Sequence, residues 1–188
     1  MLDSITYESW NCDVAVPIPK RSYLYHLRPI GVGATHVESL TGYIARLAEA
    51  HNVPAGVLLT RELLPHIRQQ SHSAKQRPPA PNYTFIYDAH MLNGLSNCPR
   101  NWVRALETLT GQTSLHVLTM LSWGQVISHL HLIRRRRAWC PYCFDCWRNA
   151  NLPVYEPLIW AIVVFPSARS ISIAWSNVAL TANRDRWP

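Results

Sequence analysis

The fold of this chain is set by the stretch Thr35-His-Val-Glu-Ser-Leu-Thr-Gly-Tyr-Ile-Ala-Arg-Leu-Ala-Glu-Ala50, which carries the clearest helical pattern in the sequence. Its apolar residues recur at intervals of three and four positions, at Leu40, Tyr43, Ile44, Leu47 and Ala48. Thr35 and Glu38 have the spacing of a capping box, whose two side chains satisfy amides of the first helical turn. Arg46 and Glu49 lie off the apolar stripe. The stretch therefore predicts an amphipathic helix packed on a core.

Two shorter helices are expected directly after it. Asn52-Val-Pro54 ends the first helix, and proline suits the first turn of the next. The pattern favours helices over 55–59 and 61–67. Residues 69–83 are polar and rich in proline, which is typical of a linker.

Residues 88–132 predict a second helical unit with a helix-turn-helix pattern. One apolar stripe is formed by Trp102, Ala105, Leu106 and Leu109. Gly111 stands where helix C-caps favour glycine, and Thr113 can begin a second helix. The inward residues of that helix would be Leu115, Leu118 and Leu121. Its outward residues, Ser114, His116, Thr119 and Ser122, include none of the types best suited to reading bases. A helical corner without DNA contact is the alternative interpretation.

The remaining segments complete the expected architecture. Residues 1–34 read as an extended N-terminal arm with a short strand at 21–27, because prolines disfavour helix there. Residues 35–132 form the helical region. Residues 133–188 form a small zinc-finger-like module and an irregular or β tail, with β-favouring segments at 160–165 and 170–175. The predicted fold class is mainly α.

Three cysteines within seven residues give the strongest chemical signal. Cys140-Pro-Tyr-Cys143 can point two thiolates at one ion, and Cys146 is a third ligand for a structural zinc. The fourth is expected from His131, with His129, Cys98, Cys12 and Asp145 as alternatives. Free or buried cysteines without metal, or a redox pair, remain open. No thioredoxin-like βαβ pattern surrounds the pair.

Four adjacent arginines give the second signal. The run Arg134, Arg135, Arg136 and Arg137 concentrates positive charge directly before the cysteines, and Arg148 follows them. Adjacent guanidinium groups repel one another unless an anion lies among them, so we expect these five residues to contact a nucleic-acid backbone. Trp139 and Trp147 can stack on bases. A solvated basic face with two core tryptophans is the alternative.

Composition limits the function classes. The chain of 188 residues has a formal net charge of +7, which favours a polyanionic partner. Neither a secretory signal nor an apolar run long enough to span a membrane is visible, so a cytoplasmic setting is expected. We find no phosphate-binding glycine loop, nucleophile elbow or carboxylate cluster, so no enzyme activity is expected.

Two stretches carry a family resemblance. The stretch from Ser22 to His51, with its core Glu38-Ser-Leu-Thr followed by Arg46-Leu-Ala, resembles the N-terminal signature of TniQ proteins. Trp139-Cys-Pro-Tyr-Cys143 and Tyr155-Glu-Pro-Leu-Ile-Trp160 resemble the first zinc-binding segment of that family. Members usually carry a further Cys/His pair after it, whereas residues 163–173 contain none. The short length is similar to TniQ proteins of type V-K CRISPR-associated transposons.

The resemblance implies a non-enzymatic adaptor in DNA transposition, in the bacterial cytoplasm. Such an adaptor links a target-recognition complex to an AAA+ ATPase regulator of the TnsC or TniB kind. The recognition complex contains a CRISPR effector with guide RNA, or is bound to target DNA, and the transposase follows indirectly. A helix-turn-helix transcription regulator is the alternative function.

Overall fold

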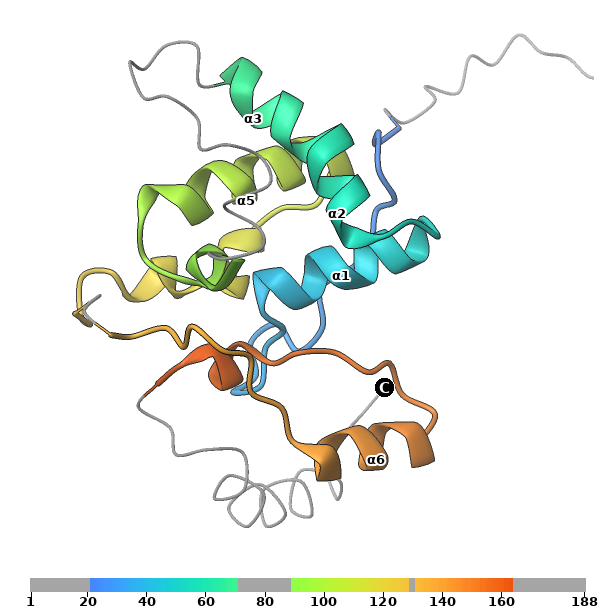
Figure 1. Ribbon diagram of the computed structural model, residues 1–188, viewed down its shortest axis with the longest axis vertical. Coiled ribbons are helices and arrows are strands. Elements are labelled where there is room, and N and C mark those ends of the chain that lie inside the picture. The colour runs from blue at the N-terminus through green and yellow to red at the C-terminus, as the bar shows by residue number, and fades with distance from the viewer. Residues whose placement is uncertain (1–20, 71–88, 129–130, 164–188) are drawn as a thin grey trace, which may run out of the picture.

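The computed structural model describes residues 21–70, 89–128 and 131–163 (Figure 1). Helices dominate the described residues, so the predicted mainly α fold is confirmed. The elements in chain order are α1 (Leu40–Ala50), α2 (Ala55–Leu58), the π-helix η1 (Leu59–Leu63), α3 (Leu64–Gln70), η3 (Ala89–Asn93), α5 (Asn97–Thr110), η4 (Leu115–Leu118), η5 (Met120–Trp123), α6 (Pro141–Asn149) and η6 (Leu158–Ala161). The elements η3 to η6 are short 3-10 helices.

Helix α1 begins later than the capping-box pattern predicts. Its N-cap is Ser39, whose Oγ accepts a hydrogen bond from the Gly42 amide at 3.1 Å. The predicted pairing of Thr35 with Glu38 was therefore wrong, because Glu38 precedes the cap and its carboxylate has other partners. The predicted apolar stripe is confirmed. All five of its members are buried, namely Leu40, Tyr43, Ile44, Leu47 and Ala48.

The segment after α1 is one helical stretch with a π turn inside it. Helix α2, η1 and α3 follow one another without a break from Ala55 to Gln70. The two separate helices expected at 55–59 and 61–67 are thus joined. The predicted linker begins inside α3, since this helix continues to Gln70, and the rest of that linker lies outside the described residues.

The helix-turn-helix prediction holds for its first half only. Helix α5 ends at Gly111, which has a φ of +67°, as the C-cap pattern predicts. The second helix does not form. Ser114 has a φ of +63° and Thr119 is extended, so the backbone leaves the α-helical region twice within six residues. Two short 3-10 helices, η4 and η5, take its place.

The main core lies between α1, α2, η1, α3, α5 and η4. Its buried side chains include Leu47, Leu63, Leu106 and Leu115, none of which exposes any of its surface. A smaller cluster is formed by Met120, Leu132 and Leu158. Each buried leucine of this kind contributes about 1.5–3 kcal/mol to folding, so the main cluster supplies most of the apolar stabilisation.

Helix α6 lies apart from the main helical body, on the far side of α1 (Figure 1). None of its residues is buried. Phe144 and Trp147 hold it to the chain through ring contacts with Trp160, at centroid distances of 5.6 and 5.9 Å. Trp147 also stacks on Tyr155 at 4.6 Å. An aromatic cluster therefore docks this helix.

Two predicted β segments differ from the structure. Residues 21–27 form no strand; Leu24 is buried, and its amide donates to the Leu109 carbonyl at 2.8 Å. Within 160–165, Trp160 and Ala161 belong to η6, and Ile162 makes an isolated antiparallel bridge with Ile133. Residues 1–20, and the tail from 164 onward with its segment 170–175, lie outside the described residues.

Candidate functional site

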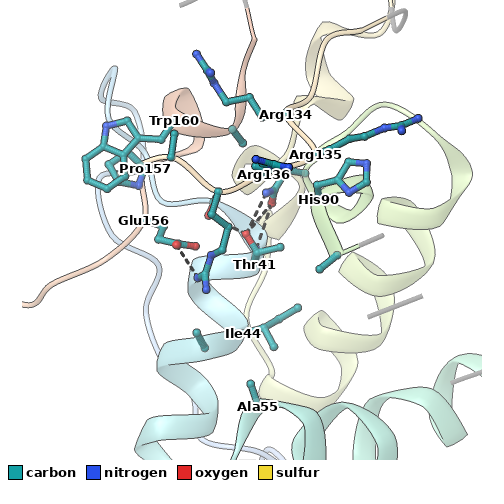
Figure 2. A pocket seen from close by; sticks show the side chains of 17 residues that line it. Thr41, Ile44, Ala55, His90, Arg134, Arg135, Arg136, Glu156, Pro157 and Trp160 are labelled. Atoms are coloured by element: carbon teal, nitrogen blue, oxygen red, sulfur yellow. Dashed lines mark hydrogen bonds and ion pairs between the residues drawn. The ribbon is translucent and has the colours of Figure 1, made fainter. Parts of the chain in front are cut away.

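A pocket of about 420 Å³ opens beside the arginine run. One wall comes from the start of α1 and from η3, and the opposite wall comes from residues 134–138 and 156–161. Figure 2 shows Arg134, Arg135, Arg136 and His90 toward one end, and Ile44 and Ala55 at the other. The pocket therefore has a cationic end and an apolar end.

The arginine run is held in place by an antiparallel contact with the chain near η6. The Arg134 amide donates to the Ala161 carbonyl at 2.8 Å, and the Val163 amide donates to the Leu132 carbonyl at 2.8 Å. The Arg134 guanidinium donates through Nε to the Ile162 carbonyl at 3.1 Å. Arg134 is thus partly buried and anchors one end of the run.

Arg137 anchors the other end through an ion pair. Its Nη2 lies 2.5 Å from Oε1 of Glu156. The arginine side chain is 70% exposed, so solvent screens the pair, and the stabilisation it gives is at most about 1 kcal/mol. The pair still has a consequence for the pocket, because it neutralises the carboxylate of Glu156 on the pocket wall.

Arg135 and Arg136 have no acidic partner within the described part of the chain. Both are exposed and line the pocket. Figure 2 shows them on the side of His90, whereas Arg134 extends in another direction. Glu156 is the one carboxylate among the residues that line the pocket, and Arg137 pairs with it, so Arg135 and Arg136 keep their positive charge available. This end of the pocket is therefore suited to an anion.

The facing wall is fixed by an amide–hydroxyl contact. Asn93 Nδ2 donates to Thr41 Oγ1 at 3.0 Å, and the Thr41 amide donates to Asn93 Oδ1 at 3.2 Å. Asn93 is buried, and Thr41 lies in the first turn of α1. The contact joins η3 to the N-terminus of α1, where the helix dipole adds a weak preference for negative charge.

A buried ion pair positions the chain just before α1. Glu38 is fully buried, and its carboxylate accepts from Arg46 Nε at 2.6 Å, from Arg46 Nη2 at 2.8 Å and from the Ile30 amide at 3.2 Å. The bidentate geometry is the strong form of this interaction. Sequence reasoning missed it by assigning Arg46 to an off-stripe position. The sequence does place one acid, Glu38, just before the helix and one arginine, Arg46, within it, and this combination could have indicated the ion pair.

The predicted zinc ligands are not all brought together. Cys140 is buried at the N-cap of α6, Cys143 is half-buried and Cys146 is exposed. Burial, and then hydrogen bonding with Cys140, raises the pKa of Cys143 to about 12. Cys140 and Cys143 therefore form a pair of neighbouring thiols. Tyr142 is hydrogen-bonded to Cys146, which raises the pKa of Tyr142.

Within residues 21–70, 89–128 and 131–163, no group of three His, Cys, Asp or Glu side chains is placed to hold a metal. His131, the predicted fourth ligand, has a φ of +55° and does not complete such a group. Cys98 packs against the main core, and Cys12 and His129 lie outside the described residues. The paired thiols supply two of the four donors that structural zinc uses, so the described residues fit zinc in part.

The remaining predicted contacts lie outside the pocket. Arg148 is exposed in the last turn of α6, and it is not among the residues that line the pocket. Trp139 is 55% exposed. Trp147 is half-buried in the aromatic cluster with Tyr155 and Trp160. For this tryptophan the structure agrees with the alternative interpretation, in which the tryptophans pack inside the protein. Of the two tryptophans, Trp139 is the one whose ring faces solvent.

The family model described as TniQ matches residues 29–165. No curated protein matches the chain. None of the helices in the described ranges is long and apolar enough to cross a bilayer.

Proposed function

The chain belongs to the TniQ family, and from this premise we propose that it is a non-enzymatic adaptor in DNA transposition. It links a target-recognition complex to an AAA+ ATPase regulator of the TnsC or TniB kind, which then acts on the transposase. The recognition complex consists of a CRISPR effector with its guide RNA, or is bound directly to target DNA. The family is associated with transposition, and its members are generally adaptors that do no chemistry.

One contact carries the proposal: the backbone bridge between the start of α1 and the segment before η6. The Ser39 amide donates to the Glu156 carbonyl, and the Leu158 amide donates to the Val37 carbonyl, each at 2.7 Å. Glu38 and Pro157 form the antiparallel bridge between them. This bridge fixes the arginine run relative to the helical body. An adaptor needs such a fixed relation, because it must hold two partners at a set distance and angle.

The arginine run provides the nucleic-acid contact in this proposal. Arg135 and Arg136 are exposed on the pocket wall, where a phosphate backbone can reach them. Arg148, exposed in the last turn of α6, and Trp139, exposed just before this helix, offer further contacts outside the pocket. The helical body on the other side of the bridge then faces the ATPase regulator.

The helix-turn-helix alternative finds no support in the described residues. Its recognition helix is replaced by η4 and η5, and Thr119, one of its outward residues, is buried. A regulator of that class inserts one end of a regular helix into the major groove. Two 3-10 turns do not offer such an element.

We also propose that the chain holds one structural zinc ion. Cys140 and Cys143 would supply two thiolates, and Cys146 a third from the next turn of α6. A zinc ion bound there would hold the N-terminus of α6, whose docking otherwise relies on the aromatic cluster. The fourth donor is His131 in our sequence interpretation.

A pull-down with the ATPase regulator of the same transposon tests the adaptor role. The tagged full-length chain is incubated with the regulator, with and without a non-hydrolysable ATP analogue and duplex DNA. We expect retention when both are present. The double variants Arg135→Ala/Arg136→Ala and Arg100→Ala/Arg104→Ala form a matched pair, since each removes two exposed arginines. Absence of retention under every condition would overturn the proposal.

A further inference from the structure

The pocket beside the arginine run has a volume and a lining that suit a small ligand. Its volume of about 420 Å³ lies near the lower end of the range of about 300–1,000 Å³ that small-ligand pockets occupy. It therefore accommodates one nucleotide-sized group. A bare patch of arginines on a convex surface would contact a backbone without enclosing any part of it.

The cationic end matches a phosphate. Arg135 and Arg136 are exposed, line the pocket and lie on the side of His90 (Figure 2). The carboxylate on the pocket wall, Glu156, is neutralised by Arg137. A phosphate at this end thus meets two arginines and an imidazole without facing a free carboxylate among the described lining residues.

The apolar end matches a base. Ile44 and Ala55 lie at the end of the pocket away from Arg134, Arg135 and Arg136 (Figure 2). Ile44 is buried, so the apolar surface open to a ligand comes from Ala55 and from Ala45, which is exposed on α1 and also lines the pocket. Apolar surface accounts for most of the pocket lining. A base inserted here is removed from water, and such a contact is sequence-tolerant because every base offers an apolar face.

From this arrangement we propose that the pocket binds one unpaired nucleotide of a single-stranded nucleic acid, with its phosphate on Arg135 and Arg136 and its base against Ala45 and Ala55. The inference rests on the proposed function, since it specifies the nucleic acid that the arginine run contacts. A paired base does not enter the pocket without first leaving its stack, which costs a few kcal/mol. The site therefore selects single strands over duplex.

Three probes of equal length test this: a fluorescein-labelled oligothymidylate, the same backbone with abasic residues, and a duplex. Binding of the full-length chain is measured by fluorescence anisotropy at several salt concentrations. We expect the oligothymidylate to bind about tenfold more tightly than the abasic strand, because one base is removed from water against apolar side chains. The duplex should bind no more tightly than the abasic strand.

Two variants separate the ends of the pocket. Ala45→Leu fills the apolar end on an exposed helical position, so oligothymidylate binding should fall to the abasic level while abasic binding stays unchanged. Arg135→Ala/Arg136→Ala should weaken all three probes and make the salt slope of the two single-stranded probes shallower by about 0.7, the amount for one phosphate contact on a single strand. Arg100→Ala/Arg104→Ala is the matched control and should leave the preference for bases intact.

Equal binding of the oligothymidylate and abasic strands, or no effect of Ala45→Leu, would overturn the nucleotide pocket. Neither result would alter retention by the ATPase regulator, which tests the adaptor role. Conversely, a chain that prefers the oligothymidylate but is never retained by the regulator would keep the pocket and overturn the adaptor. Circular dichroism of each variant establishes that the fold is intact.

Discussion

Arg46 in α1 forms a bidentate ion pair with Glu38: its Nε lies 2.6 Å from Oε1 of the carboxylate, and its Nη2 lies 2.8 Å from Oε2. Glu38 is fully buried, and the arginine side chain is 15% exposed. Arg46 also donates to the Arg28 carbonyl at 3.0 Å. One side chain thus ties the loop before α1, the helix and the bridge to Pro157 into one unit.

Removing one partner of this pair should therefore destabilise the protein strongly. Arg46→Ala leaves a buried carboxylate without its counter-charge, and such a loss costs about 3–5 kcal/mol. Chemical denaturation followed by circular dichroism measures the free energy of unfolding. Glu49→Ala, an exposed position on the same helix, is the control and should change it by less than about 0.5 kcal/mol. A small effect of Arg46→Ala would show that the pair does not hold the loop.

Gly42 leaves little room for a side chain, because α1 and the segment before η6 approach each other there. An added Cβ would lie 3.1 Å from the Glu156 Cβ and 3.2 Å from the Glu156 carbonyl oxygen. We expect Gly42→Ala to lower the free energy of unfolding by about 1–3 kcal/mol, as overpacking of a core does. Thermal denaturation provides the measurement.

Gly56→Ala is the matched control for this prediction. Gly56 lies in α2, and an added Cβ there meets no atom within 4 Å. The same substitution should stabilise the protein by about 0.4–1 kcal/mol, because alanine restricts the unfolded chain. Two substitutions of one kind should thus act in opposite directions, and equal effects at the two sites would contradict the close contact with Glu156.

The sequence predicted correctly those features that depend on residues close together in the chain. The apolar spacing of Leu40, Tyr43 and Leu47 identified the buried face of α1, and Gly111 identified the end of α5. Each signal lies within a few residues of the feature that it predicts. By contrast, Ser114 adopts a left-handed conformation that nothing in its neighbours signals, and this residue is where the predicted recognition helix fails.

The sequence predicted an anion contact for the arginine run, which stays a prediction, and it did not predict how the pocket around that run is arranged. The run of four arginines indicated a surface that could bind an anion. Which arginines remain available depends on the carbonyl of Ile162 and the carboxylate of Glu156, which lie 28 and 19 positions away from their partners Arg134 and Arg137. The pocket itself requires Asn93 and Thr41 from another part of the chain. Such long-range pairings have no local sequence signal.

Ionisation of Tyr43 should make the protein unstable at high pH. Burial raises the pKa of Tyr43 to about 12 from its ordinary value of 10.0, and its hydroxyl donates to the Leu27 carbonyl at 2.9 Å. The unfolded chain releases this proton more readily than the folded chain. Stability from this group is therefore complete below pH 10 and is lost as the pH rises from 10 through 12.

Unfolding by denaturant at pH 8, 10 and 11 checks this expectation. Tyr43→Phe removes the titrating group, so the loss of stability between pH 8 and 11 should become smaller, although the variant starts about 1 kcal/mol lower because a hydrogen bond is missing. Tyr155 also has a pKa raised by burial, so part of the loss should persist. An unchanged pH dependence in Tyr43→Phe would contradict the assignment.

The cysteines of α6 should react in an order that reveals whether zinc is bound. Without metal, exposed Cys146 should be alkylated by iodoacetamide before half-buried Cys143, whose raised pKa leaves little thiolate at pH 8. With zinc, Cys140, Cys143 and Cys146 should all be protected, and a chelator should restore the order. Peptide mass spectrometry identifies the modified residues, and elemental analysis should find about one zinc ion per chain. Rapid modification of Cys146 in a zinc-containing protein would remove it from the ligand set, because a thiolate held by the metal is no longer a free nucleophile.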